Sequence, residues 1–139
     1  GWEAIKATER SANPDSSALA GVTLALPALM RAEKLQKRAA RAGFDWPDPS
    51  GPRAKILEEM AEVDAEPCLE EIGDLLFAVV NWARHLAFDP EVALRAANDK
   101  FERRFRTMEN IAGPDFAALS LDEKEVLWNE AKKAGVSAP

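Results

Sequence analysis

The chain has 139 residues, a formal net charge of −6 at pH 7 and a single cysteine, Cys68. A lone cysteine excludes an internal disulfide and favours a cytoplasmic setting. The acidic balance argues against a general nucleic-acid-binding protein, which would present a basic surface to the phosphates. The sequence has no apolar run of roughly 20 residues and no signal-peptide pattern, so we expect one soluble domain that makes no membrane contact.

Helical periodicity runs through most of the chain, and no segment shows the sustained alternation of a strand. Residues 1–23 are expected to form a helical lead-in, at 2–10, and a loop, and the sequence leaves open whether this part is mobile. Further helices are expected over residues 27–41, 52–65, 67–86, 90–111 and 121–133. Short connections between them favour an all-α antiparallel bundle of four to five helices over residues 24–135, followed by a tail at 136–139.

Local signals mark several of the expected helix ends. Pro67 suits the first turn of the third of these helices, where its missing N–H costs nothing. Asp89, followed by a proline, predicts an N-cap. Ser120 with Glu123 predicts a capping box, and Gly135 is expected to end the last helix.

Apolar side chains dominate the positions that should face inward on the helices at 52–65 and 67–86. Examples are Leu57, Met60, Leu76 and Val79. The apolar face of the second of these helices is so wide that little polar side remains. We therefore expect it to be covered on several sides, either by other helices or by a second subunit.

Four carboxylates form two pairs with helical spacing. Glu59 and Glu62 are three residues apart, and so are Glu71 and Asp74, so each pair can direct its oxygens at a common point. A tight turn between the two helices would fold them into an antiparallel hairpin and join the pairs into a cluster of hard oxygen ligands. The alternative is that these acids form solvated helix surfaces. Gly73 argues against it, because its missing side chain lets another group come close to Asp74.

Basic and aromatic side chains form a second set of candidates. Lys55 lies one helical turn before the first acidic pair. Lys100 and Arg104 are also one turn apart and could bind phosphate, or could form a basic surface stripe. Trp128 and Lys132 have the same spacing, and Trp128 could equally be a core residue.

The sequence around these residues resembles that of the MazG nucleoside triphosphate pyrophosphohydrolases. Glu58-Glu59-Met60-Ala61-Glu62 followed by Glu71-Ile72-Gly73-Asp74 is similar to the family's EExxE…ExxD signature. The flanking segments match in order, and they include Leu26–Leu29, Gly43–Trp46, Gly73–Phe77, Lys100–Phe105 and Trp128. The resemblance covers nearly the whole chain and most closely matches the C-terminal half of the two-halved bacterial MazG proteins.

This resemblance implies an all-α homodimer that hydrolyses nucleoside triphosphates between the α and β phosphates, giving a monophosphate and pyrophosphate. It implies that Mg²⁺, with Mn²⁺ as a substitute, is held by the two acidic pairs, Glu59, Glu62, Glu71 and Asp74. Glu58 is implied as a neighbour that supports or activates water. The implied substrate-binding residues are Lys55, Lys100, Arg104, Trp128 and Lys132.

Two other functions stay open at this point. The segment between Glu62 and Glu71 is shorter than the insert that the family usually carries. A non-catalytic helical module for dimerisation or regulation is therefore one alternative. The other is a pyrophosphatase restricted to one nucleotide, such as dUTP or dCTP. A di-iron carboxylate site is excluded, because the Glu-x-x-His pattern is absent and His85 is expected to be a helix-end packing or surface residue. Asp45 and Trp46 remain open as further nucleotide contacts.

Overall fold

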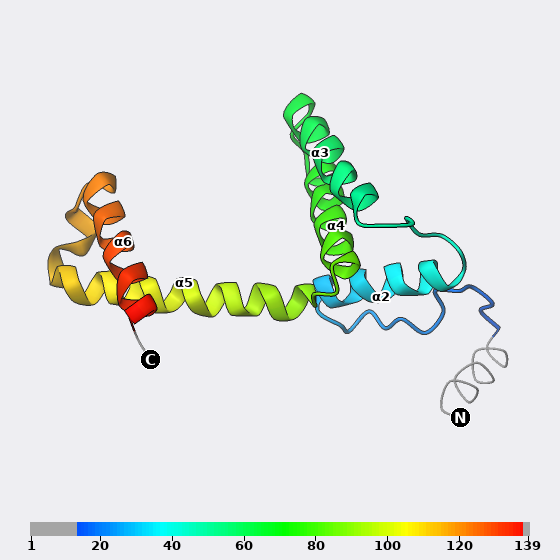
Figure 1. The fold of residues 1–139 in the computed structure, drawn as a ribbon, viewed down its shortest axis with the longest axis horizontal. Helices are drawn as coiled ribbons and strands as arrows, with labels where there is room; N and C mark the ends of the chain where they lie inside the picture. The colour runs from blue at the N-terminus through cyan, green and yellow to red at the C-terminus, as the bar shows by residue number, and fades with distance from the viewer. Residues whose placement is uncertain (1–13, 138–139) are drawn as a thin grey trace. The chain divides into compact units, whose positions relative to one another are not determined.

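The computed structural model describes residues 14–137, and all regular structure within that range is helical. It comprises α2 (Ala28–Arg41), α3 (Ser50–Ala65), α4 (Leu69–His85), α5 (Pro90–Ala112), the 3₁₀ helix η1 (Gly113–Ala118) and α6 (Leu121–Ser137) (Figure 1). The all-α prediction is therefore confirmed for the described part of the chain. The expected lead-in helix at 2–10 lies outside it, as do residues 138 and 139 of the expected tail.

The chain divides into two compact units, Gly1–Glu91 and Val92–Pro139. The first unit holds α2, α3 and α4, and the second holds most of α5 together with η1 and α6. None of the helices in residues 14–137 combines the length and the apolar character needed to cross a membrane.

An antiparallel hairpin of α3 and α4 forms the centre of the first unit, and α2 packs against α4 (Figure 1). Only Glu66, Pro67 and Cys68 connect the two hairpin helices. Glu66 adopts a non-helical conformation, with φ −148° and ψ 84°, as residues before a proline usually do. The tight hairpin expected from the sequence is thus present.

The start of α4 differs from the expectation. The sequence predicts a helix that begins at Pro67, whereas Cys68 is extended and α4 begins at Leu69. The Cys68 carbonyl accepts the first helical hydrogen bond, from the Ile72 N–H at 3.1 Å. This register places Glu71 in the first turn, where a negative charge interacts favourably with the helix dipole.

The described interior of the first unit is small and partly polar. Ala78, Val80 and Pro52 are buried, and so are the polar residues Gln36 and Glu59. The expectation that all the apolar positions of α3 and α4 face inward is wrong for this chain by itself. The exposed fractions are 56% for Leu57, 47% for Met60, 55% for Leu76 and 43% for Val79. Among residues 14–137, the three helices of this unit leave these apolar side chains partly uncovered.

The second unit is held by a row of aromatic rings. The ring of Phe101 lies 5.9 Å from that of Phe105 and 5.8 Å from that of Trp128, which joins α5 to α6. Phe105 meets Phe116 of η1 edge to face at 5.3 Å. Met108 of α5 and Ala131 of α6 are buried as well.

The predicted capping box at the start of α6 is confirmed. The Glu123 N–H donates to Ser120 Oγ and the Ser120 N–H donates to Glu123 Oε1, both at 3.1 Å. The other end of this helix differs from the expectation, because α6 continues through Gly135 to Ser137. Gly135 has no positive φ, so it does not form the left-handed cap that would end the helix there.

Candidate functional site

Three carboxylates meet on the facing sides of α3 and α4. One oxygen each from Glu59, Glu71 and Asp74 lies within 4.8 Å of the other two. Glu59 comes from α3 and is only 7% exposed, whereas Glu71 and Asp74 lie one turn apart at the start of α4. The hairpin therefore brings together residues of both acidic pairs, as their spacing predicts.

Glu62, the fourth predicted ligand, is exposed and lies outside this group. Its charge nevertheless acts on the group. Partial removal from water, followed by the negative charges of Glu62, Glu59 and Asp74, raises the pKa of Glu71 above its usual value of 4.5. The four acids thus form one electrostatic cluster in which three share a common point and Glu62 stands at the edge.

Lys55 supplies a positive charge beside this cluster. Its Nζ lies 3.2 Å from Glu59 Oε1 and 3.3 Å from Glu58 Oε1. The hydrogen bonds to Glu59 and Glu58 raise the pKa of Lys55. Glu58 points into solvent, with 60% of its side chain exposed. Lys55 and Glu58 therefore occupy the rim of the cluster, while Glu59 forms its interior.

The donor set fits a hard divalent cation. Carboxylate oxygens are the ligands that Mg²⁺ and Mn²⁺ prefer, and the three residues stand on two packed helices rather than on loops. Carboxylates held this close repel each other, and this repulsion adds to partial removal from water in raising the pKa of Glu71. A bound cation would remove it.

The sequence suggests that Gly73 makes room for another group beside Asp74, and no group of the described chain occupies that space. A Cβ atom built at Gly73 would meet no atom of residues 14–137 within 4 Å. The close neighbour expected beside Asp74 is therefore not provided by this part of the chain.

A pocket of about 590 Å³ lies elsewhere in the first unit, between α2, α4 and the loop that follows α2. The loop begins with a Schellman turn, in which the Phe44 N–H donates to the Ala39 carbonyl and the Gly43 N–H donates to the Ala40 carbonyl, each at 3.0 Å. Gly43 adopts the positive φ of 91° that this turn requires. The turn ends α2 and begins the loop that carries Asp45.

Asp45 fixes this loop to the end of α4. Its Oδ1 accepts from Arg84 Nη2 at 2.6 Å, its Oδ2 accepts from Arg84 Nη1 at 3.2 Å, and His85 Nε2 lies 2.8 Å from Oδ1. The Arg84 hydrogen bond is the main reason that the pKa of Asp45 falls to about 2. The sequence predicts a helix-end packing or surface residue at His85, and the structure shows the packing role, but sequence spacing gives no sign of this contact across 40 positions.

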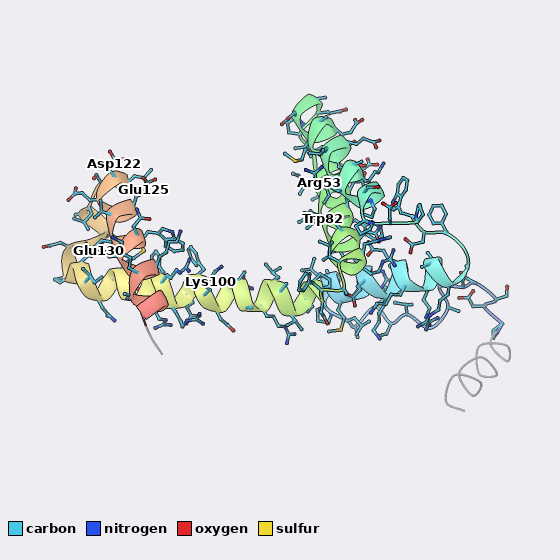
Figure 2. All side chains as sticks on the ribbon, viewed as in Figure 1. Arg53, Trp82, Lys100, Asp122, Glu125 and Glu130 are labelled. Atoms are coloured by element: carbon cyan, nitrogen blue, oxygen red, sulfur yellow. The ribbon has the colours of Figure 1, made fainter. Side chains whose placement is uncertain are left out.

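The remaining predicted substrate residues belong to the second unit. The guanidinium carbon of Arg104 lies 5.3 Å from the ring centroid of Trp128, in the range of a cation–π contact. Lys132 is exposed, and Lys100 projects from α5 into solvent (Figure 2). Within this unit the structure thus brings Arg104 and Trp128 together and leaves both lysines accessible.

Comparison with known proteins identifies the relatives of this chain. It is 44% identical over 144 residues to a nucleoside triphosphate pyrophosphohydrolase of Escherichia coli K12, with 95% of this chain and 55% of the relative covered. It is 41% identical over 138 residues to the nucleoside triphosphate pyrophosphohydrolase/pyrophosphatase MazG of Thermotoga maritima, with 94% and 54% covered. The chain is homologous to MazG. The resemblance seen in the acidic signature is therefore confirmed.

The chain spans about half the length of these two relatives. A third relative, the uncharacterized protein YabN of Bacillus subtilis, is 46% identical over 143 residues, with 95% of this chain and 29% of YabN covered. No protein-family model matches the chain. The region shared with the MazG relatives includes the α3–α4 hairpin and its acids.

Proposed function

We propose that this chain carries the catalytic site of a nucleoside triphosphate pyrophosphohydrolase, which cleaves between the α and β phosphates and releases a monophosphate and pyrophosphate. The observation that carries the proposal is the convergence of Glu59, Glu71 and Asp74 within 4.8 Å. The names of the relatives from Escherichia coli and Thermotoga maritima, both nucleoside triphosphate pyrophosphohydrolases, support the substrate class.

In this proposal Glu59, Glu71 and Asp74 hold Mg²⁺, or Mn²⁺ in its place, and Glu62 is the candidate fourth ligand. The bound cation supplies charge neutralisation at the phosphate oxygens and a lowered pKa of water. The protein contributes rigidity, because two of the ligands lie on one turn of α4 and the third is buried on α3. No covalent intermediate is needed, since water attacks the α phosphorus and pyrophosphate leaves.

The rim residues then have distinct tasks. Glu58 is exposed beside Glu59 and can accept a proton from the attacking water. Lys55 aligns Glu59 and presents its ammonium group at the edge where a triphosphate would arrive. Lys100, Arg104 and Lys132 are proposed to bind the phosphates, and Trp128 to contact the nucleotide.

The homodimer and the cytoplasmic setting belong to the same proposal. The half-exposed apolar side chains of α3 and α4, such as Leu57 and Leu76, provide surface that a second copy could cover. Light scattering coupled to size-exclusion chromatography tests the dimer directly. A monomer at micromolar concentration would contradict it.

The activity is tested by incubating the protein with a panel of ribo- and deoxyribonucleoside triphosphates, with Mg²⁺ and with EDTA. Separation of monophosphate and pyrophosphate from diphosphate and phosphate identifies the bond that is cleaved. Glu59→Gln and Asp74→Asn should abolish turnover, whereas Asp64→Asn, an exposed acid on the same helix as Glu59, should retain it.

The same panel separates the competing functions. Turnover of several bases supports a general enzyme, and turnover of one alone supports a nucleotide-restricted pyrophosphatase. If a folded helical protein turns over none of them, the chemistry is absent, and a dimerisation or regulatory module is the better description.

A further inference from the structure

The hairpin of α3 and α4 is joined by the chain at one end only. The three-residue connection links the last turn of α3 to the first turn of α4, whereas the first turn of α3 and the last turn of α4 lie at the opposite, open end (Figure 1). The buried apolar residues of the two helices are Pro52, Ala78 and Val80. So small a set of buried side chains contributes little to keeping the open end together.

Two consecutive residues of the loop between α2 and α3 bridge this open end. Asp45 accepts two hydrogen bonds from Arg84 in the last turn of α4, at 2.6 and 3.2 Å, and His85 Nε2 lies 2.8 Å from its Oδ1. The ring of Trp46 lies against the first turn of α3, because a Cβ atom at Gly51 would lie 2.5, 2.6 and 2.7 Å from its Cδ2, Cε3 and Cγ. The Trp46 N–H also donates to Asp45 Oδ1 at 2.8 Å. We call these contacts the Asp45–Trp46 clamp.

The polar half of the clamp is fixed in position. Arg84 Nε donates to Asn81 Oδ1 at 2.9 Å, which orients the guanidinium group toward the loop. The side chains of Arg84 and Asp45 are only 13% and 27% exposed. A forked, charge-assisted pair of this kind is stronger and more directional than a neutral hydrogen bond. The loop is therefore held firmly on α4, and the ring of Trp46 next to it is held on α3.

The geometry of the hairpin connects the clamp with the acidic cluster. Glu59 precedes Glu66, at the turn, by about 10 Å along α3, and Gly51 precedes it by about 22 Å. If α3 pivots at the turn, a displacement at Gly51 moves Glu59 by about half as much. An opening of about 2 Å at the clamp would thus shift Glu59 by about 1 Å, whereas metal–ligand distances tolerate only about 0.2 Å. Such a shift separates Glu59 from Glu71 and Asp74.

We propose that the Asp45–Trp46 clamp is a positioning device for the metal site, which keeps the carboxylate of α3 in register with those of α4. The inference rests on the metal site of the proposed function. It assigns a role in metal binding to residues outside the acidic cluster, since Gly51 and Arg84 lie about 12 and 15 Å along their helices from Glu59 and Asp74. Loss of the clamp lowers the fraction of protein in the closed form, and the apparent metal affinity falls with that fraction.

Calorimetric titration with Mn²⁺ in the absence of nucleotide tests the clamp. Asp45→Asn should weaken Mn²⁺ binding about three- to tenfold, because it removes the charge that holds Arg84. Gly51→Ala displaces the Trp46 ring and should weaken Mn²⁺ binding to a similar extent. Alanine favours a helix more than glycine does, so this loss would not come from a weaker α3.

Phe44→Ala is the matched control for both variants. It removes a ring that is 84% exposed from the same loop and leaves the clamp contacts in place, so Mn²⁺ should bind as it does to the wild type. Wild-type Mn²⁺ affinity in both Asp45→Asn and Gly51→Ala would overturn the proposal. So would an equal loss in Phe44→Ala, because any change in the loop would then have the same effect.

Metal should in turn protect the clamp, since coupling between two sites is reciprocal. The Arg53 N–H donates to the Pro49 carbonyl at 3.2 Å in the first turn of α3, and its hydrogen exchange, followed by NMR, reports opening at this end. Mg²⁺ should slow this exchange about threefold or more. The Arg31 N–H, which donates to the Pro27 carbonyl at 2.9 Å in α2, should be unaffected. Unchanged exchange at Arg53, or equal slowing at both amides, would overturn the coupling.

Two outcomes separate this inference from the proposed function. If Mn²⁺ binding is lost in Glu59→Gln but unchanged in Asp45→Asn and Gly51→Ala, the metal site stands and the clamp is removed. If Mn²⁺ binding depends on Glu59 and on the clamp but no triphosphate is hydrolysed, the proposed reaction is removed and the clamp is retained. A wild-type protein that binds no Mn²⁺ would overturn both.

Discussion

The Nζ atom of Lys55 lies 3.2 Å from Oε1 of Glu59, so the most buried acid of the cluster is paired with a cation one turn earlier on α3. That pair must loosen when a divalent cation takes the same carboxylate. A Lys55 ammonium group released in this way becomes available to a phosphate. We propose that metal and substrate binding are coupled through this one side chain.

Lys55→Met should separate these two effects. Loss of the positive charge should increase the affinity for Mn²⁺ in the absence of nucleotide, because the ion no longer competes with the ammonium group. The same variant should raise KM for a triphosphate about tenfold, since one charge-assisted hydrogen bond is worth about 1.5–3 kcal/mol. Calorimetry with Mn²⁺ alone and steady-state kinetics measure the two quantities. Weaker Mn²⁺ binding together with an unchanged KM would contradict the coupling.

The acidic residues should differ in importance according to their place in the cluster. Glu59→Gln and Asp74→Asn should lower metal affinity about 100-fold or more, whereas Glu62→Gln should lower it only about tenfold, because Glu62 stands outside the common point. Mn²⁺ titrations on the three variants make the comparison. Equal losses would show that Glu62 moves into the group when metal binds.

Glu71 should make the metal-free protein more stable at mildly acid pH. Its pKa is raised in the folded state, so the folded protein binds this proton more tightly than the unfolded chain does. Stability should therefore fall as pH rises from the usual value of 4.5 through the raised value. Thermal unfolding in EDTA across this range measures the effect, and Glu71→Gln should remove it. Added Mg²⁺ should reverse the trend, because the metal competes with the proton.

Asp45 should show the opposite pH dependence. Its pKa is lowered from 3.8 to about 2, so its contribution to stability is complete above 3.8 and disappears as pH falls through 2. Asp45→Asn should destabilise the first unit by about 1–2 kcal/mol at neutral pH, a value that allows for partial solvent screening. Urea titrations of the variant and the wild type test this. A variant of unchanged stability would show that Arg84 and His85 find other partners.

Alanine substitutions at Gly51 and Gly73 should have different effects, because only the first would meet a neighbouring side chain. A Cβ atom at Gly51 would lie 2.5 Å from Cδ2 of Trp46, so Gly51→Ala must displace that ring and should change its fluorescence. Gly73→Ala meets no described atom and should stabilise α4 by about 0.5–1 kcal/mol. Tryptophan fluorescence and thermal unfolding measure the two responses. Loss of turnover in a stabilised Gly73→Ala protein would indicate that substrate comes close to this position.

Local chemistry explains which parts of the fold the sequence predicts well. The capping box at Ser120 and Glu123 involves residues three apart, so the helix start can be identified without knowledge of the rest of the fold. The convergence of Glu59 with Glu71 and Asp74 is also predictable, because it needs only helical spacing and a short turn. The start of α4 predicted from Pro67 is two residues too early, since a proline suits the segment before a helix as well as its first turn.

Contacts between distant segments explain the rest. Asp45 and Arg84 are 39 positions apart, and no periodicity connects a loop with the end of a helix. The same holds for the hydrogen bond between Gln36 and the Phe77 carbonyl, which are 41 positions apart and both line the pocket. The exposure of Leu57 and Met60 could not be predicted either, because apolar character does not specify which neighbour will cover a side chain.

The three-residue connection between α3 and α4 has a kinetic consequence. Glu59 and Glu71 are only 12 positions apart in the chain, so closing the loop between them costs little entropy. Contacts of such low sequence separation form early, because they do not wait for distant segments to meet. The acidic cluster should therefore assemble with the hairpin itself, before the loop carrying Asp45 reaches the end of α4. A metal ion present during refolding would encounter its ligands at that early stage.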